Sequence, residues 1–528
     1  MKHLLFLIFA VQACLPGFAA CDGRVRIVPR PAEVEELPGS FRLTPRTPVV
    51  ITDERLRTPA EIFARAVGKL TGTEPAVTAV PEKHAVTLHL QPGYEAEEYL
   101  LEVGRQRITV TASTPQAVLH GLRSLQQLVA GGEIPACVVR DKPTFAYRGA
   151  MLDVCRHFFP VEDVKTYIDI LSLHKINKFH WHLTDDQGWR IEIKKYPLLT
   201  QIGSRRAETL VGRYDKNKEG VYDGKPYGGF YTQEEIREIV SYAAERHIEV
   251  IPEIEMPGHG LAALTAYPWL GCTGGPYAVW THWGISDDVY CAGKETTFEF
   301  IEDVLTEVLA LFPSKLIHIG GDECPKGRWK ACPLCQQRIR EEGLKDEYQL
   351  QSYFIHRIER WMHTHGREII GWDEILQGGI SKTANIMSWN GSDPGIKAAQ
   401  RGNPVIMTPK WYCYFDYSQT SDPERYEPLG NTRYVSVRQA YRLDPCDRLT
   451  LPDQKRIRGV QCNLWTEYIA DIRHAQHMVL PRMAALAETG WANDRKDYND
   501  FVRRIPALVA VYKAEGYNYA PYLFEGIE

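Results

Sequence analysis

The most constraining feature of the sequence is a repeated alternation of short apolar segments and amphipathic stretches between residues 149 and 462. Eight apolar segments have the length and composition of β-strands, at residues 149–154, 178–183, 249–254, 316–320, 368–372, 385–388, 404–407 and 459–462. Strands that alternate with helices in this way form parallel sheets, and eight such units close into a barrel. The sequence therefore predicts an α/β protein built on a (β/α)8 TIM barrel.

The segment ahead of these units has a different pattern. Alternating strands are indicated at residues 86–90 and 107–111, and helical runs at 59–70 and 115–129, which predicts a small α/β domain. With 528 residues, of which 44% are hydrophobic, the chain can bury more than one core. The expected organisation is a signal segment at 1–20, an N-terminal domain at 22–143, the catalytic barrel at 144–492 and a helical extension at 493–528.

The first twenty residues predict export. They carry one charged residue, Lys2, followed by an apolar run and small residues, which is the pattern of a secretory signal. The next residue, Cys21, resembles the lipid-bearing cysteine of a bacterial lipoprotein, although Phe18 stands where an aliphatic residue is usual. We expect a periplasmic or outer-membrane-anchored lipoprotein, with a free exported form as the alternative. The net charge of −5 argues against nucleic acid as a partner, and the sequence leaves the oligomeric state open.

A strand that ends in two glycines and two acids marks the expected reaction centre. Residues 316–323 read Leu-Ile-His-Ile-Gly-Gly-Asp-Glu, so that Asp322 and Glu323 stand where a barrel strand opens into the active-site mouth. Neighbouring side chains on an extended chain diverge, so the two acids are poorly placed to grip a substrate from opposite faces. We expect them to touch two different groups of one substrate. The alternative is a solvated acidic turn or a helix N-cap.

The motif His-Ile-Gly-Gly-Asp-Glu resembles the signature of the family 20 glycoside hydrolases, the β-N-acetylhexosaminidases. Further stretches between Arg148 and Glu488 also resemble this family. The resemblance implies that Glu323 protonates the glycosidic oxygen. It also implies that Asp322 orients the 2-acetamido group of the substrate, whose carbonyl oxygen attacks the anomeric carbon. Such substrate-assisted chemistry departs from the usual scheme of two protein carboxylates, and it calls for no cofactor.

Polar residues that follow the first three strands resemble the same family. By this resemblance Arg156 binds outer hydroxyls of the sugar, for which a fixed fork of donors is well suited. Asp185 and His259 would form a buried polar chain that tunes Glu323, because a general acid needs its carboxyl protonated near neutral pH. Glu255 stands where the family usually has Asp, which leaves the details of this chain open.

Aromatic residues follow the later strands, where flat rings could pack against the faces of a sugar and hold the acetamide near the anomeric carbon. The alternative for any one of these rings is plain core packing. The resemblance assigns the pocket walls to Trp372, Trp389 and Trp465. It makes Tyr414 a hydrogen-bond donor to the acetamide oxygen, and it places two acids, Asp416 and Glu467, near the sugar hydroxyls.

Histidines and cysteines raise the question of a metal. His180 and His182 share one face of a strand, as in metal-dependent amidohydrolases, but a second ligand set is not evident. Cys324, Cys332 and Cys335 form a cluster after the acidic pair, for which a zinc site would need a fourth ligand that the local sequence does not offer. We favour structural cysteines or one local disulfide there. Cys272 and Cys291 bracket a loop of the kind that a disulfide closes. The expectation is no metal in the catalytic site.

The sequence thus predicts an exported exo-β-N-acetylhexosaminidase that releases terminal GlcNAc or GalNAc from glycans with retention of configuration. Three alternatives stay open at this point: a metal-dependent amidohydrolase, a sugar-binding lipoprotein without activity, and a disaccharide-releasing relative of the same family. The sequence does not distinguish GlcNAc from GalNAc or define the linkage.

Overall fold

The computed structural model describes residues 23–527, and the predicted signal segment and Cys21 lie outside this range. Within it, no helix combines the length and the apolar character needed to cross a membrane. The chain begins with an α/β domain in which a seven-stranded sheet has the order β1-β7-β5-β6-β4-β2-β3. Its strands are β1 (Glu33–Phe41), β2 (Val49–Ile51), β3 (Val77–Thr78), β4 (Val86–Leu90), β5 (Tyr99–Val103), β6 (Ile108–Ala112) and β7 (Ile134–Asp141).

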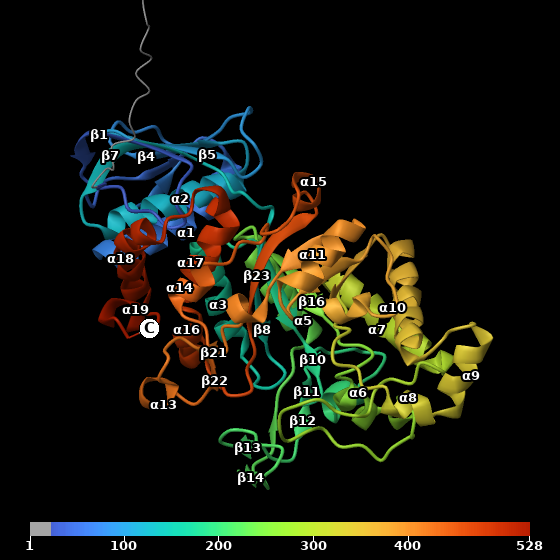
Figure 1. Ribbon diagram of the computed structural model, residues 1–528. Coiled ribbons are helices and arrows are strands. Elements are labelled where there is room, and N and C mark those ends of the chain that lie inside the picture. The colour runs from blue at the N-terminus through green and yellow to red at the C-terminus, as the bar shows by residue number, and fades with distance from the viewer. Residues whose placement is uncertain (1–22, 528) are drawn as a thin grey trace, which may run out of the picture.

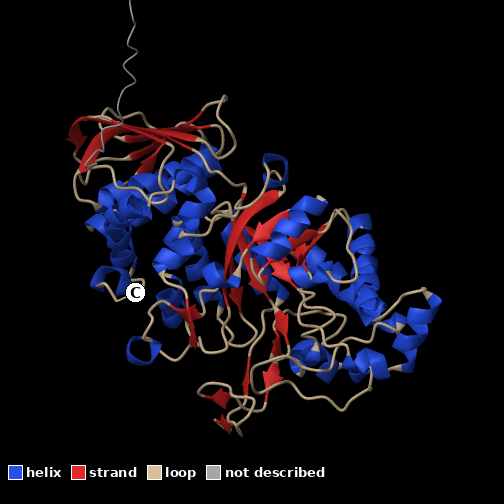
Figure 2. Ribbon diagram, in the orientation of Figure 1, coloured by secondary structure: helices blue, strands red, loops and turns tan. Residues whose placement is uncertain are grey.

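Two amphipathic helices cover one face of this sheet, α1 (Arg57–Thr71) and α2 (Pro115–Ala130). Thr114 caps α2 by accepting a hydrogen bond from the backbone N–H of Ala117, and Pro115 stands at the first helical position, where a missing N–H costs nothing. Figure 2 shows the sheet on the outside of the molecule, with the helices between it and the rest of the chain.

The second domain is a closed barrel of eight parallel strands, which confirms the predicted fold class. Around the barrel the strands are β8 (Tyr147–Asp153), β9 (Lys178–His182), β16 (Glu249–Glu253), β17 (Leu316–His318), β18 (Glu368–Trp372), β19 (Asn385–Ser388), β20 (Val405–Met407) and β23 (Ile457–Leu464). Their side chains are almost all buried, as expected for parallel strands that are covered on both faces.

Helices pack around this barrel, among them α3 (Val161–Leu173), α5 (Gln233–Ala244), α7 (Glu295–Leu311), α10 (Glu347–Thr364), α11 (Ser392–Arg401), α16 (Ile472–Val479) and α17 (Arg482–Ala492). The regular alternation fails once. Between β18 and β19 the chain forms only a 3₁₀ turn, η3 (Asp373–Leu376), because twelve residues leave little room for a full crossover helix.

The end of the chain returns to its beginning. Helix α18 (Tyr498–Glu515) packs against both α1 and α2, and Figure 1 shows it beside the N-terminal domain. Trp491, at the end of α17, belongs to the hydrophobic core of that first domain. Beneath it lies a buried pair in which the Lys175 ammonium is 3.1 Å from Asp141 and 4.4 Å from the Trp491 ring centre. The two domains therefore share one continuous interface.

Candidate active site

A cavity of about 170 Å³ opens at the carboxyl ends of the barrel strands. It is lined by residues from the loops after β8, β9, β16, β17, β19, β20 and β23. The lining residues are Arg156, Asp185, Glu255, His259, Asp322, Glu323, Trp389, Tyr414, Asp416, Tyr417, Asn431, Arg433, Trp465 and Glu467. The structure thus brings together every predicted site residue except Trp372.

The floor of this site is a ring of ionisable residues at the strand ends. Asp153, His182, Glu253 and His318 are in register on four neighbouring strands, β8, β9, β16 and β17. His318 Nδ1 lies 2.7 Å from a Glu253 oxygen, and His182 Nδ1 lies 3.3 Å from Asp153. All four side chains are buried. Because burial without partners would be costly, these contacts fix each group in one position.

The two glycines at the end of β17 direct the acidic pair. Gly320 and Gly321 have φ angles of 66° and 93°, in the left-handed region that favours glycine. A Cβ atom on Gly320 would come within 1.6 Å of a Glu255 oxygen, so no side chain fits there. After this turn, the Asp322 side chain is 10% exposed and the Glu323 side chain 33% exposed. The neighbouring acids therefore occupy different surroundings.

A chain of charged groups leads from Arg156 to Glu323. The Arg156 guanidinium lies 2.8 Å from Asp185, and Asp185 lies 3.3 Å from His259 Nδ1. The other imidazole nitrogen of His259 is 3.6 Å from a Glu323 oxygen and 4.0 Å from Asp322. The polar chain expected from the sequence is therefore present in the geometry.

The direction in which this chain tunes Glu323 differs from the expectation. Burial raises the pKa of Glu323, but the facing His259 and the more distant Arg156 outweigh burial and hold that pKa below its ordinary value. Burial would lower the pKa of His259, yet Asp185, Asp186 and Glu323 raise it well above the ordinary value. Together these two shifts favour an imidazolium on His259 facing a carboxylate on Glu323 in the protein without substrate. Such a pair would store the proton of the general acid on His259 rather than on Glu323.

The pKa of Asp322 is shifted in the opposite direction to that of Glu323. Its pKa is raised well above the ordinary value, first by burial and then by the charge of Glu255. The pKa of Glu255 is itself raised to about 8, mainly by burial and by the nearby Glu253. A positive charge or a hydrogen-bond donor that arrives next to such a carboxyl group lowers its pKa again and favours the ionised form. Asp322 is therefore suited to stabilise a group that becomes cationic during the reaction.

Aromatic rings form the wall opposite these acids. Trp389 and Tyr414 stack nearly parallel at 5.9 Å, and Trp465 lies 6.2 Å from Tyr414. The Trp389 indole N–H donates to Glu374 at 2.8 Å, which fixes the orientation of its ring. Trp372 lies one layer deeper, fully buried, and donates to Glu253 at 2.9 Å while it packs 5.9 Å from Trp465. Trp372 thus supports the wall from below and does not itself line the cavity.

The cavity is also lined by three residues that the sequence analysis missed, Tyr417, Asn431 and Arg433. Asn431 and Arg433 belong to β22 (Asn431–Tyr434), a short strand in the long connection after β20. The Asn431 amide donates to Asp416 at 3.4 Å, and the Arg433 guanidinium donates to the Tyr417 hydroxyl at 3.1 Å. No motif marks this loop, so no signal in the sequence could have identified them. Together with Arg156 and Glu467 they provide both donors and acceptors for hydroxyl groups.

The His-x-His pair is held by protein groups. His180 has one ring nitrogen 2.8 Å from Glu253 and the other 2.9 Å from the Gln461 amide. His182 lies between Asp153, at 3.3 Å, and Glu255, at 3.4 Å. Each imidazole therefore has a hydrogen-bond or ion-pair partner on both sides, which accounts for its placement without an ion.

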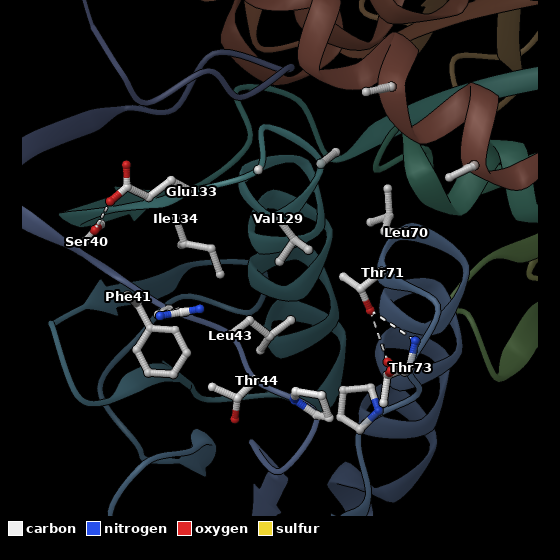
Figure 3. A pocket seen from close by; sticks show the side chains of 17 residues that line it. Ser40, Phe41, Leu43, Thr44, Leu70, Thr71, Thr73, Val129, Glu133 and Ile134 are labelled. Carbon is white, nitrogen blue, oxygen red and sulfur yellow. Dashed lines mark hydrogen bonds between the residues drawn. The ribbon is translucent and has the colours of Figure 1, made fainter.

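A larger hollow, of about 810 Å³, lies outside the barrel between the N-terminal domain and α18. Figure 3 shows its labelled lining, which is mostly apolar side chains and threonines, with a hydrogen bond between Ser40 and Glu133 at one edge. Its lining contains one carboxylate and no cluster of titratable groups. The hollow therefore lacks the means for acid–base chemistry, which the strand-end cavity has.

An eight-stranded barrel whose mouth combines an acidic pair, an Arg–Asp–His chain and aromatic walls defines a sugar-cleaving hydrolase. Comparisons with known protein families agree. Residues 145–494 match the model described as glycosyl hydrolase family 20, catalytic domain, and residues 24–142 match domain 2 of that family. The chain belongs to glycosyl hydrolase family 20, and its activity is that of a β-hexosaminidase.

Individual relatives support this assignment. A β-hexosaminidase of Porphyromonas gingivalis is 42% identical, with 98% of this chain and 68% of that protein covered, and one of Vibrio furnissii is 38% identical, with 88% and 76% covered. Among solved structures, an exo-β-N-acetylglucosaminidase of Vibrio harveyi in complex with N-acetylglucosamine has a TM-score of 0.84 at 31% identity, covering 94% of this chain and 78% of its own. A β-hexosaminidase of Streptomyces plicatus has a TM-score of 0.82 at 32% identity, covering 94% and 96%.

Proposed function

We propose that the protein removes terminal β-linked GlcNAc or GalNAc residues from glycans with retention of configuration, and that the acetamide of the substrate acts as the nucleophile. The observation that carries the proposal is the placement of two adjacent acids in one cavity with opposite surroundings. Glu323 is partly open and faces His259, whereas Asp322 is buried beside Glu255. One acid is available for proton transfer, and the other can hold an amide.

In the first step, a proton must reach the glycosidic oxygen as its bond to the anomeric carbon breaks. The proton passes from His259 to Glu323, 3.6 Å away, and Glu323 delivers it to the glycosidic oxygen, which leaves His259 neutral and Glu323 a carboxylate. The same carboxylate then accepts a proton from the water that opens the cyclised intermediate, which returns the pair to its starting charge. The Arg156–Asp185 contact holds His259 in place throughout.

The acetamide needs an acceptor for its N–H and a donor for its C=O. Asp322 offers the acceptor, and the Tyr414 hydroxyl, which lines the same cavity, offers the donor. As the carbonyl oxygen attacks, the amide nitrogen becomes positively charged, and ionised Asp322 stabilises it. Trp389 and Trp465 limit the room around the acetamide and keep it near the anomeric carbon.

Outer hydroxyls of the sugar meet Arg156, Asp416 and Glu467 at the rim of the cavity. The pKa of Glu467 is raised by burial, which the nearby Arg156 only partly offsets. Arg156 can donate hydrogen bonds to sugar hydroxyls, and the carboxyl groups of Asp416 and Glu467 can accept them. The 4-hydroxyl is equatorial in GlcNAc and axial in GalNAc, so these residues would decide which of the two sugars fits. Parallel assays with nitrophenyl glycosides of both sugars measure that preference.

The decisive experiment compares Glu323→Gln with Asp322→Asn and with the exposed control Glu299→Gln. General acid catalysis contributes about 10²–10⁴-fold, so Glu323→Gln should lose that much turnover of a GlcNAc disaccharide and still bind GlcNAc. A thiazoline that mimics the cyclised intermediate should inhibit the wild type, and NMR should show the β-anomer as the first product. A glycosyl ester trapped on any side chain, or equal cleavage of glucosides with a plain 2-hydroxyl, would refute the mechanism.

A further inference from the structure

Four cysteines from two distant segments converge beside the barrel mouth. Cys272 and Cys291 lie in the long loop after β16, and Cys332 and Cys335 lie around the start of α9 (Pro333–Glu341). Their sulfur atoms all lie within 4.8 Å of one another. Cys291, Cys332 and Cys335 are buried, and Cys272 is partly exposed. Cys324, which the sequence grouped with this cluster, is not part of it.

The backbone of both segments is shaped to bring these sulfurs together. Gly271 pairs with Tyr290 in an isolated antiparallel bridge, and the N–H of Cys291 donates to the carbonyl of Leu270 at 2.8 Å. This places Cys272 and Cys291 side by side. Gly293 then touches the start of α9 so closely that a Cβ atom there would lie 2.3 Å from the Leu334 carbonyl carbon. The two cysteine pairs thus face each other across a contact that only glycine permits.

The distances between the sulfur atoms match those of a metal site and not those of a disulfide. Cys272 and Cys335 have their Sγ atoms 3.8 Å apart, Cys291 and Cys332 also 3.8 Å, and Cys291 and Cys335 3.6 Å. Four thiolates around a zinc ion at about 2.3 Å form a tetrahedron whose edges are about 3.8 Å. A disulfide would require about 2.05 Å. The observed separations are those of a tetrathiolate site.

The connectivity also argues against two disulfides. Cys291 is near both Cys332 and Cys335, and Cys335 is near both Cys272 and Cys291, so the sulfurs do not separate into two pairs. Cys332 and Cys335 have the Cys-x₂-Cys spacing common in zinc sites. The sequence near Cys332 and Cys335 offers too few ligands for zinc. The remaining two, Cys272 and Cys291, come from a loop forty residues or more upstream.

We propose that these four cysteines bind one Zn²⁺ ion in a closed, structural site. Tetrahedral sulfur coordination selects zinc or iron, and a four-thiolate set leaves no open position for a substrate. Two hydrogen bonds from one lysine steady the surroundings. The Lys294 ammonium donates to the carbonyls of Trp269 and Gly271 at 2.7 Å, and its positive charge beside the site favours a dianionic zinc–thiolate cluster.

The ion would link the two loops that carry the catalytic acid and its partner. His259 lies in the loop after β16 upstream of Cys272, and Glu323 lies in the loop after β17 upstream of Cys332. The Trp329 indole N–H already joins these loops by donating to the carbonyl of Tyr290 at 2.9 Å. Zinc would thus hold the 3.6 Å separation between His259 and Glu323, with no part in the chemistry itself.

The test begins with the wild-type enzyme purified without chelators. Elemental analysis should find about one zinc per chain, and the four cluster thiols should resist a thiol reagent until the protein is denatured with a chelator. The double variant Cys332→Ser/Cys335→Ser should lose the zinc and melt at a lower temperature. Cys446→Ser, which alters a cysteine remote from the cluster, should keep both.

A second measurement does not depend on the folding of any variant. Wild-type protein stripped of metal and mixed with Co²⁺ should develop the intense absorption of tetrahedral cobalt thiolate, and Zn²⁺ should displace it. Absence of zinc, together with an intact mass about four daltons below the reduced value, would show two disulfides and overturn the proposal. Four reactive thiols in the folded, metal-exposed enzyme would overturn it equally.

Discussion

Replacement of His259 by Asn tests the central electrostatic feature of the site. His259 makes contacts of 3.3 Å with Asp185 and Asp186 and faces Glu323 at 3.6 Å. Asn can place a polar atom where Nδ1 faces Asp185, but it has no atom in place of Nε2 and carries no charge. Loss of a hydrogen bond to a charged group costs about 1.5–3 kcal/mol. Because the Glu323 contact, at 3.6 Å, is an ion-pair contact beyond hydrogen-bond distance, we expect the lower half of this range, about 10–40-fold in kcat/KM.

The pH profile gives a sharper test than the rate. The imidazolium of His259 lowers the pKa of Glu323 more than any other group, so its removal leaves only the more distant Arg156 to oppose burial and raises that pKa. A general acid is active while protonated. The descending alkaline limb of kcat/KM should therefore move to higher pH in His259→Asn, although the maximum is lower. The loss should be larger for a GlcNAc disaccharide than for a nitrophenyl glycoside, whose leaving group needs less protonation.

The measurement is kcat/KM from pH 4 to 9 for both substrates, with the exposed histidine variant His363→Asn as the control. The control should retain the wild-type profile. If the alkaline limb of His259→Asn stays in place or moves to lower pH, then His259 does not set the charge of Glu323. The proton-storage argument would then fail, even if the rate falls as expected.

Three further predictions address other parts of the molecule. Tyr414→Phe should lower kcat/KM by about fivefold, because a neutral hydrogen bond is worth about 1 kcal/mol, and it should leave the melting temperature unchanged. Equal losses for an acetamide-free substrate would contradict its role. Gly320→Ala should lower the melting temperature and the activity, because the new Cβ atom would overlap the Glu255 side chain. Adding Glu255→Asp to the same protein should restore part of the melting temperature and part of the activity. Burial lowers the pKa of Lys175 from 10.5 to about 8. The unfolded chain therefore binds more protons between these values, and urea midpoints should rise across that pH range in the wild type but not in Lys175→Met.

The strands and the reaction centre could be predicted because they depend on local sequence. Apolar runs flanked by helical patterns identified all eight barrel strands, and carboxyl ends of parallel strands meet at one edge. Residues directly after strands, such as Arg156, Asp322 and Glu323, therefore had to lie near one another. The absence of a helix between β18 and β19 also has a local cause, the short connection.

Other features depend on distances between remote segments, which sequence does not encode locally. The charge state of Glu323 depends on His259, sixty-four positions earlier in the chain. Trp372 resembles its neighbours Trp389 and Trp465 in sequence, but its position within the strand turns its ring into the barrel core. The cysteine cluster required two loops to meet, so the local sequence showed only half of it.

The packing of α18 has a consequence for how the chain is made. A domain synthesised first usually folds first. Here α1 and α2 receive their covering from α18, and Trp491 fills the first domain's core. The apolar surface of the N-terminal domain therefore stays open until α18, which is synthesised much later, packs against it. Truncation of the last thirty residues should accordingly expose the opposite end of the polypeptide to proteases.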